Sequence, residues 1–417
     1  MIKQSILSIL LRSATLLSKF IFLIFIARFL GPKELGDYGL ITVSISVVIY
    51  ILGADFYIYN TREILKSSQN RVPILIRDQF IFHLFLYVVI LPLCLFLFVF
   101  NLVHWNYFLM FYLLLVSEHL SQECYRLLIT LSKPLFANVI LFIRNGIWIY
   151  ILILLFVFLD KKIQSLNIIL LLWFLGGMFS VILTLYGLKK LDWSVIKNQP
   201  INWKWIKAGI WNSLIFLVSS ICIQLIPFLE RVVLKKFEGT EKVGIYTYYS
   251  NIANTVLTFI VTGVFTILYP KLIKSYQNGD FAEYKKIMRK ISIFGGGGGL
   301  FLIILSIIGI QVVLLFSNNA IYYKNLHVYW ILLFSVFMNI LSYIPHYALY
   351  VRKVDKYIMF SALGSLIVSI LFNIILVPLL GITGTAISNF LATTSLFILK
   401  IIFINRVNKL YNYSTTN

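Results

Sequence analysis

The sequence has few charged residues and very few acidic ones. Of its 417 residues, 12% are charged and 60% are hydrophobic, whereas about a quarter of the residues in soluble domains are charged. Asp and Glu together number 15 against 36 Lys and Arg, which gives a formal net charge of +21. This composition lies far outside the range of soluble globular domains.

Cysteine is scarce as well, and Cys94, Cys124 and Cys222 lie far apart in separate apolar segments. Their spacing excludes a disulfide framework and a cysteine metal site, so packing is the expected role of these side chains. His83 and His119 also lack partners at the spacing of metal ligands. A phosphate-binding loop with the Walker pattern is absent. We therefore expect no metal ion and no other cofactor.

Long apolar segments make up most of the chain. Each is about 20 residues long, the length that a helix needs to cross the hydrocarbon core of a bilayer. The alternating strands of about ten residues that build a membrane barrel are absent. The sequence therefore predicts an all-α polytopic membrane protein. Twelve transmembrane helices are expected, at residues 5–30, 37–59, 78–100, 107–130, 135–158, 166–188, 207–233, 243–268, 291–316, 327–350, 357–379 and 382–404.

Lys and Arg lie mostly in the short connectors between these segments. Roughly three times as many occupy connectors on the side of the N-terminus as on the opposite side, and positively charged connectors remain in the cytoplasm. This bias predicts a multi-pass protein of the cytoplasmic membrane with both termini in the cytoplasm. It also accounts for the net charge without a nucleic-acid partner.

A short signature occurs twice, half a chain length apart. It reads RFLGPKELGDY from Arg28 to Tyr38 and KFEGTEKVGIY from Lys236 to Tyr246. Both copies connect an odd-numbered span to an even-numbered one, so both are expected on the outer side. The halves are then parallel repeats of six spans, related by a pseudo-twofold axis along the membrane normal. We predict an N-terminal lobe at 1–190, a cytoplasmic linker at 191–206 and a C-terminal lobe at 207–417.

The signature contains residues that suit a tight turn between helices. Its glycines are Gly31 and Gly36 in the first copy and Gly239 and Gly244 in the second. Pro32 fits the first position of a helix. A structural role and a functional role explain this turn equally well.

Charged residues inside the predicted spans are informative, because each costs about 2.5–3.5 kcal/mol at the centre of a span. In the first span, Arg12 and Lys19 lie on one polar face with serine and threonine side chains. This face is expected to contact water or protein, and either a cavity or internal ion pairing explains it. Arg28 points elsewhere, near the outer end, where its long side chain can reach the interface.

Further charges occur in the fourth and fifth spans. Glu123 and Arg126 are three residues apart in the fourth span, a spacing that allows an ion pair. Basic residues within spans are concentrated in the first half, which suggests a cationic cavity for an anionic ligand such as a diphosphate joined to a sugar chain. The residues predicted to bind it are Arg12, Lys19, Arg126, Arg144 and Arg28.

Acidic residues in or near the spans are candidates for ion coupling or gating. They are Glu118, Glu123, Asp55 and Glu230. Glu230 and Arg231 are adjacent and cannot share a helix face, so separate partners are expected for them.

Three segments of the sequence resemble a known family. The first signature with its neighbours, ARFLGPKELGDYGL, is similar to that of the multidrug/oligosaccharidyl-lipid/polysaccharide (MOP) exporter superfamily. The segments KKFEGTEKVGIYTYYSNIAN and FNIILVPLLGITGTAISNFLA also resemble their equivalents in that superfamily. The resemblance is greatest to its polysaccharide-biosynthesis branch, the Wzx-type O-antigen flippases. By motif match, Arg28, Gly31, Gly36, Tyr38, Gly239, Gly244 and Tyr246 correspond to the family signature.

The resemblance implies a flippase rather than an enzyme. Such a protein moves an undecaprenyl-diphosphate-linked oligosaccharide, for example an O-antigen unit of lipopolysaccharide, to the outer leaflet of the bacterial inner membrane. Two six-helix lobes of the MATE/MOP type would open alternately to either side. The membrane potential or a gradient of Na⁺ or H⁺ would supply the energy. Expected partners are the substrate, membrane lipids, and the polymerase and chain-length regulator of the pathway.

Other functions explain the sequence less well. An ion-coupled multidrug exporter of the same superfamily would more naturally have an acidic cavity for cationic drugs. A membrane polysaccharide polymerase or ligase usually needs a sizeable outer loop, and the outer connectors are about ten residues or fewer by this span assignment. A scaffolding protein leaves the charges within several spans unexplained.

Overall fold

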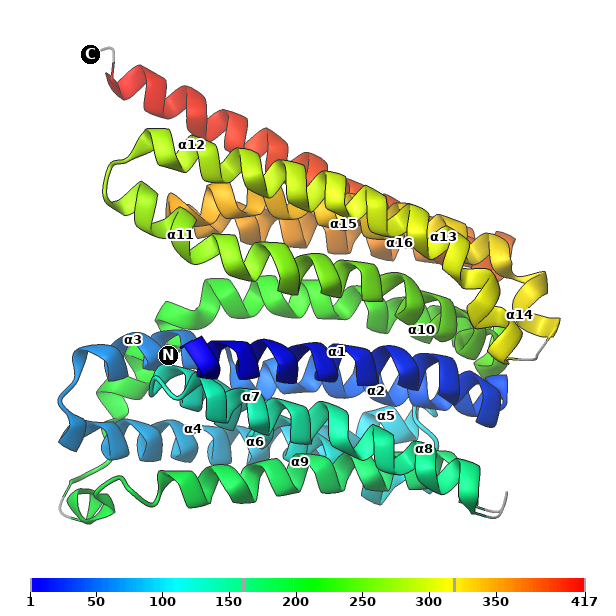
Figure 1. Cartoon of the computed structure of the whole chain (residues 1–417), viewed down its shortest axis with the longest axis horizontal. Helices are drawn as coiled ribbons and strands as arrows, with labels where there is room; N and C mark the ends of the chain where they lie inside the picture. Colours follow the sequence, from blue (N-terminus) through cyan, green and yellow to red (C-terminus); the bar gives the residue numbers. More distant parts are fainter. Residues whose placement is uncertain (1, 160–162, 198, 318–319, 416–417) are drawn as a thin grey trace. The chain divides into compact units, whose positions relative to one another are not determined.

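The chain forms long helices in the computed structural model shown in Figure 1. The structure describes residues 2–159, 163–197, 199–317 and 320–415. Every regular element in these ranges is a helix, so the predicted all-α class is confirmed. A helix pairs its backbone N–H and C=O groups within the segment, which is what a bilayer requires of an apolar chain.

The chain divides into two compact units, and the first comprises Met1–Leu30 and Leu40–Leu217. Its helices are α1 (Ile2–Phe29), most of α2 (Pro32–Gly53), α3 (Phe56–Lys66), α4 (Val72–Leu93), α5 (Leu95–Val99), α6 (Phe108–Thr130), α7 (Pro134–Phe142), α8 (Trp148–Phe158), α9 (Leu166–Leu188) and the start of α10 (Trp203–Ile260). A π-helical turn, η3 (Ile143–Ile147), connects α7 to α8, and short turns lie at η1 (Gln69–Arg71), η2 (Trp105–Tyr107) and η5 (Trp193–Ile196). Within this unit α1 packs on α7, η3 and α8, and α6 packs on α9.

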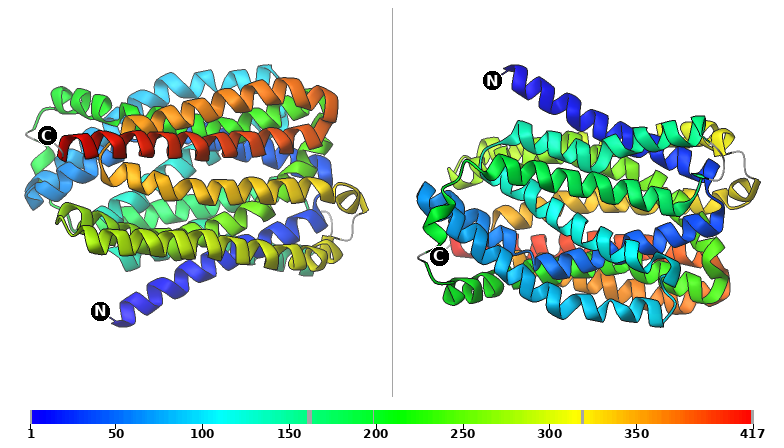
Figure 2. Two further views of the ribbon diagram at one scale, coloured as in Figure 1. Left: turned by 90° about the horizontal axis from the view of Figure 1, so that it is seen from above. Right: turned by 90° about the horizontal axis from the view of Figure 1, so that it is seen from below.

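The second unit comprises Gly31–Gly39 and Val218–Asn417. Its elements are the first residues of α2, most of α10, η6 (Val261–Phe265), α11 (Thr266–Gln277), α12 (Phe281–Lys290), η7 (Ile291–Gly297), α13 (Gly298–Ser317), α14 (Ala320–Lys324), α15 (Leu326–Val351) and α16 (Asp355–Thr415). Within this unit α15 lies alongside α16 (Figures 1 and 2). The division between the units falls inside α10, and the lobe bounds given above stay a prediction.

Nine helical segments within the described ranges are long and apolar enough to cross a membrane. Two of them, Trp203–Gln277 and Asp355–Lys409, are 75 and 55 residues long, well beyond the ~20 residues that a bilayer needs. Each bends at a glycine with positive φ, at Gly239 (81°) and at Gly381 (54°). Helix α6 is not among the nine because of its polar and charged side chains, although its 23 residues are long enough to span.

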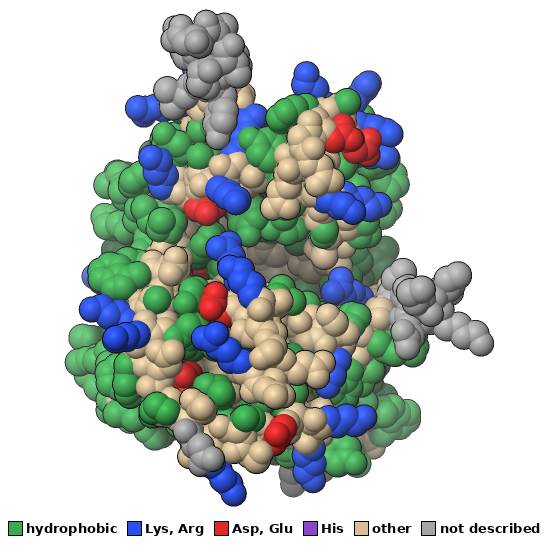
Figure 3. Space-filling model, turned by 90° about the vertical axis from the view of Figure 1, so that its left-hand side faces the viewer, with side chains coloured by type: hydrophobic (Ala, Val, Ile, Leu, Met, Phe, Trp, Pro, Cys, Tyr) green, Lys and Arg blue, Asp and Glu red, His purple; other side chains and the backbone are tan. Residues whose placement is uncertain are grey.

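Large apolar side chains are exposed along the helices. Val88 on α4 is 75% exposed, and Ile308 on α13 is 67% exposed. Contiguous apolar surface of this kind is typical of a protein face that meets lipid. Figure 3 looks at one end of the molecule, where Lys and Arg side chains predominate over Asp and Glu. A chain of this kind is a multi-pass membrane protein.

The predicted linker region is held against α4. The Arg77 guanidinium donates hydrogen bonds to the carbonyl oxygens of Ile196, Gln199 and Pro200 at 2.6–3.0 Å. In the same segment Asp192 accepts hydrogen bonds from the Ser194 hydroxyl and backbone N–H, which lower the pKa of the Asp192 carboxyl from its usual value. The described residues of this segment are thus held by Arg77 of α4 and by the contact of Asp192 with Ser194.

The two signature copies form similar turns. Gly31 lies in the first turn and Pro32 is the first residue of α2, as expected from its fixed φ. In the second copy Gly239 has a φ of 81° and makes the bend in α10, a conformation that glycine adopts without strain. The second glycine of each copy, Gly36 or Gly244, lies inside the following helix rather than in the turn.

These helical glycines bring the two signature copies into direct contact within the second unit. A Cβ atom on Gly36 would lie 2.8 Å from Cγ2 of Thr240, and one on Gly244 would lie 2.8 Å from the carbonyl carbon of Pro32. Pro32 and Thr240 occupy equivalent places in the two copies, so the contact is reciprocal. Gly39 lies against Thr247, its own equivalent in the second copy. A reciprocal contact of this kind is the mark of twofold symmetry.

We expect replacement of Gly36 or Gly244 by Val to lower the thermal stability of the purified protein. The added side chain would have to displace backbone atoms of the other copy, and overpacking of this kind costs about 1–3 kcal/mol or more. The measurement is thermal unfolding in detergent, followed by tryptophan fluorescence.

Gly31 supplies the matched control from the same signature. A Cβ atom there meets nothing within 4 Å, so Gly31→Ala is expected to unfold at the wild-type temperature. Equal melting of Gly36→Val, Gly244→Val and wild type would show that the close approach does not stabilise the fold.

Candidate functional site

The polar face of α1 contacts α6 and α7 within the first unit. Arg12 donates hydrogen bonds to Oδ1 of Asn138 at 3.0 Å and to the hydroxyl of Tyr125 at 3.4 Å. Both acceptors are uncharged, so the positive charge of Arg12 is not neutralised by them. Lys19, two turns further along α1, is exposed. In the part of the chain that the structure describes, Lys19 makes no ion pair.

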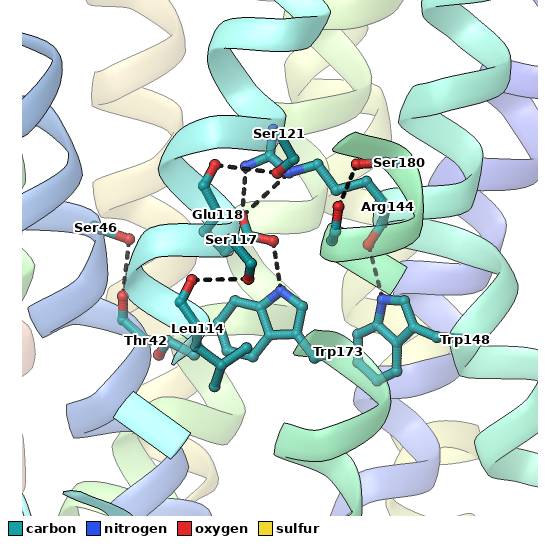
Figure 4. Close-up of polar contacts among 11 residues, drawn as sticks. Thr42, Ser46, Leu114, Ser117, Glu118, Ser121, Arg144, Trp148, Trp173 and Ser180 are labelled. Carbon is teal, nitrogen blue, oxygen red and sulfur yellow. Dashed lines mark hydrogen bonds and ion pairs between the residues drawn. The ribbon is translucent and has the colours of Figure 1, made fainter. Parts of the chain in front are cut away.

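A buried ion pair lies close to Lys19. Arg144 in η3 donates hydrogen bonds from Nε (3.2 Å) and Nη2 to Oε2 of Glu118 in α6, and Trp173 of α9 donates to Oε1 at 2.7 Å. Figure 4 shows Arg144 and Trp173 pointing toward this carboxylate from separate helices. Glu118 and Arg144 are 6% and 8% exposed, and the charges of both act on Lys19. The cluster of Lys19, Arg144 and Glu118 thus has more positive than negative charge.

The predicted ion pair between Glu123 and Arg126 is present, with an Nη1–Oε1 distance of 2.6 Å. The other carboxylate oxygen of Glu123 accepts a hydrogen bond from Gln79 at 2.7 Å, and Gln79 accepts one from Asn60. Arg126 also lies over the ring of Tyr57, with Cζ 3.7 Å from the ring centroid. The guanidinium is therefore fixed by a carboxylate and an aromatic face.

These residues line a cavity of about 400 Å³ within the first unit. The cavity lies among α3, α4, α6 and α9, and Arg77, Glu123 and Arg126 are the charged residues of its wall. Its size is near the lower end of the range for small-ligand pockets, ~300–1,000 Å³. Arg12, Lys19 and Arg144 do not line this cavity, so four of the five predicted basic residues form two groups, with Arg126 in the cavity wall and the other three outside it.

Neither Arg28 nor Asp55 lines this cavity, although the charge of Asp55 acts on Tyr57 of its wall. Arg28 is exposed at the end of α1. Asp55 is 3% exposed and has a φ of 45°, in the break between α2 and α3. The predicted span at 37–59 is displaced toward the C-terminus, because the helix begins at Pro32 and ends at Gly53. It ends there because Ala54 and Asp55 both adopt positive φ.

In the second unit Glu230 and Arg231 have separate hydrogen-bond partners, as their adjacency predicts, although Arg231 also lies over the ring of Tyr246. The carboxylate of Glu230 accepts hydrogen bonds from the Tyr246 hydroxyl at 2.9 Å and from the Asn389 amide at 2.7 Å. Arg231 donates instead to Thr247, Ser250 and the Pro227 carbonyl oxygen at 2.9–3.1 Å. Tyr246 thus connects the second signature copy to a buried carboxylate.

The comparison with family models decides which family this is. Residues 1–275 match the model described as "Polysaccharide biosynthesis protein". The chain belongs to the polysaccharide biosynthesis protein family. The resemblance noted from the sequence is thereby confirmed. A search of curated proteins finds no match.

Three solved structures with a similar fold are described as MATE transporters. An inward-facing multidrug resistance MATE family transporter of the MOP superfamily matches with a TM-score of 0.76 at 14% identity, covering 97% of this chain and 99% of that one. An outward-facing MATE transporter matches at 0.64 and 15% identity, covering 97% and 94%. A mutant of the Vibrio cholerae MATE transporter VcmN matches at 0.62 and 14% identity, covering 98% of each chain. This polysaccharide biosynthesis protein therefore has a MATE-like fold.

Three features of these sites were not predicted from the sequence. Trp173 and Asn138 are ordinary residues of apolar spans until the fold places them beside Glu118 and Arg12. Lys400 lies near the end of a predicted span, where a lysine is expected at the membrane interface. In the structure its side chain is 6% exposed and lines a cavity of the second unit. The sequence feature that indicates a buried lysine is its position as the single charged residue in the apolar run FILKIIF.

Replacing Arg144 with Met is expected to destabilise the protein, because it leaves the Glu118 charge buried without its partner. Breaking a buried ion pair in this way costs about 3–5 kcal/mol. The double variant Glu118→Gln/Arg144→Met removes both charges and is expected to recover much of this loss. Melting temperatures in detergent, with fluorescence as the signal, measure both effects.

The exposed pair of Glu283 and Lys286 is the matched control, with side chains 43% and 64% exposed. Lys286→Met should change stability by less than ~1 kcal/mol, as is usual for surface pairs. If Arg144→Met behaved like Lys286→Met, the buried pair would have no structural role.

Proposed function

We propose that this protein transfers a lipid-linked oligosaccharide from the cytoplasmic to the outer leaflet by alternating access. The carrier would be undecaprenyl diphosphate and the glycan an O-antigen or similar repeat unit. Membership of the polysaccharide biosynthesis protein family and the MATE-like fold support a transporter of polysaccharide precursors. The sugar head group would cross between two lobes while the prenyl chain stays in lipid.

The observation that carries this proposal is the excess positive charge of the first unit. Lys19 is exposed beside the Glu118–Arg144 pair, and within the described residues the acceptors of Arg12 are uncharged. A cation within a span is costly unless a partner compensates it. A diphosphate supplies such a partner, because its oxygens accept charge-assisted hydrogen bonds from Lys and Arg.

Twelve spans in two six-helix lobes are part of the proposal. Counting α10 with α11 as two spans, α16 as two and α6 as one gives this number. The reciprocal contact of the signature copies supports a pseudo-twofold relation between the halves. The bias of Lys and Arg supports cytoplasmic termini in the bacterial inner membrane.

Among the four acidic candidates for ion coupling, Glu230 suits the role best. Glu118 and Glu123 are each ion-paired with an arginine, whereas Glu230 accepts hydrogen bonds from a tyrosine and an asparagine. A carboxylate held by neutral donors can exchange a proton or a sodium ion at lower cost than one paired with arginine.

Neutralising the basic residues of α1 tests the proposal directly. The double variant Arg12→Gln/Lys19→Gln should lose at least tenfold in surface polysaccharide, because each charge-assisted hydrogen bond contributes about 1.5–3 kcal/mol. The measurement is surface-polysaccharide staining of native cells that carry the variant in place of the wild-type gene. Membrane amounts are matched by immunoblot.

Lys33 provides the control, since it is exposed at the start of α2 and lies outside both basic groups. Lys33→Gln should leave export unchanged, and Lys19→Arg should retain it because the charge is kept. Normal export by the correctly inserted double variant would refute the role of the cationic face.

The membrane potential is expected to drive transfer outward. A head group with about two negative charges moving outward gains about 2.3 kcal/mol per charge per 100 mV of inside-negative potential. In proteoliposomes with a potassium diffusion potential, fluorescent diphosphate-linked glycan should accumulate in the outer leaflet in proportion to the imposed potential. Equal transfer with and without the imposed potential would show that another energy source is used.

A multidrug exporter is the second candidate, because the similar solved structures include multidrug resistance transporters. Their identity of 14–15% shows the fold alone. Deletion of the gene separates the two functions: a flippase mutant loses surface polysaccharide, whereas an exporter mutant becomes sensitive to cationic drugs.

A further inference from the structure

A second cavity, of about 370 Å³, lies wholly within the second unit among α10, α15 and α16. Its size is again near the lower end of the ~300–1,000 Å³ range for small-ligand pockets. Polar side chains dominate parts of its wall, which is unusual between apolar helices. They include Ser219, Gln224, Asn254, Asn339, Asn389 and Thr393.

Lys400 is the cation of this cavity. It is 6% exposed, and its ammonium makes a hydrogen bond of 3.4 Å to the Ser342 hydroxyl. The ring of Tyr343 lies beside it, with a distance of 6.0 Å from Nζ to the centroid. Within the described part of the chain Lys400 has no ion pair. A lysine ammonium has three N–H donors, so donors remain for a ligand.

The neutral groups of the wall offer hydrogen-bond donors, acceptors and an aromatic face that suit a sugar ring. Asn389 donates one amide N–H to Glu230 behind the wall, which orients its amide. Asn254, on the rim, is exposed, and its amide offers both donors and an acceptor to hydroxyl groups. Tyr343 presents an aromatic body with a polar tip, which suits the apolar C–H face of a sugar.

We propose that this cavity is a binding site for a sugar that carries a carboxylate, with Lys400 pairing with the carboxylate and the amides binding the hydroxyls. The inference rests on the proposed function, since it names an acidic sugar as part of the transported glycan. It places a second recognition site in the second unit, separate from the cationic face of α1. Glu230 is not a lining residue, and its charge is held by Tyr246 and Asn389.

Direct binding to the full-length protein in nanodiscs tests this site. Glucuronate, glucose and inorganic phosphate are titrated separately, and binding is followed by calorimetry. The wild type should bind glucuronate at least tenfold more tightly than glucose or phosphate, a difference of about 1.4 kcal/mol. Lys400→Met should remove this preference while the affinity for glucose stays within twofold.

Three further variants separate the roles of the residues. Lys400→Arg keeps the charge and should retain the preference for glucuronate. Lys409→Met, a change at an exposed lysine on the same helix, should bind as the wild type does. Asn254→Ala should weaken glucuronate and glucose alike, because it removes a group that binds hydroxyls.

Two results would overturn the proposal: equal glucuronate binding by Lys400→Met and wild type, or tighter binding of phosphate than of glucuronate. Surface-polysaccharide export by the wild type is measured in parallel. Normal export without glucuronate binding would reject the acidic-sugar site and leave the proposed function standing. Lys400-dependent glucuronate binding in a protein whose deletion leaves surface polysaccharide intact would instead reject the proposed function.

Discussion

The cost of placing a charge inside an apolar bundle governs how this protein is built. A charged side chain at the centre of a span costs several kilocalories per mole unless a partner compensates it. Glu118 and Arg144 meet this requirement through each other, with Trp173 as a third partner. The positions of α6, η3 and α9 are therefore coupled by one polar contact. The same requirement is why the proposed function assigns an anionic ligand to Arg12 and Lys19.

The two units compensate their buried charges with different kinds of partner. In the first, carboxylates pair with Arg126 and Arg144, and the charges in excess lie on α1. In the second, Arg231 is bound by hydroxyls and a carbonyl oxygen, and Lys400 lies in a cavity with neutral amides. Under the proposed function, the cations that would bind the ligand lie at separate places in the sequence, which suits a long ligand with several polar groups better than a compact one.

The fold was largely predictable, because a bilayer permits few structures for long apolar segments. The ion pair of Glu123 and Arg126 could also be predicted, since their spacing places them on one helix face. The pair of Glu118 and Arg144 could not, because its members lie on different spans and meet only through tertiary packing. Lys400 has the sequence position of an interfacial residue, and only the position of α16 beside α15 shows it to be buried. The end of α2 at Gly53 was not predicted. Ala54 and Asp55 end the helix by adopting positive φ, and the pair Ala-Asp does not by itself predict that conformation.

The reciprocal contact of the signature copies bears on how such a chain could arise. Gly36 meets the position equivalent to Pro32, and Gly244 meets Pro32 itself. A half-length chain with a single copy of the signature would present the same self-complementary surface to a second molecule, as an isologous dimer does. Fusion of two such chains would keep that contact and free each half to change its own polar residues. The divergence between the charged cluster of the first half and the amide-lined cavity of the second is the outcome that such a history would produce.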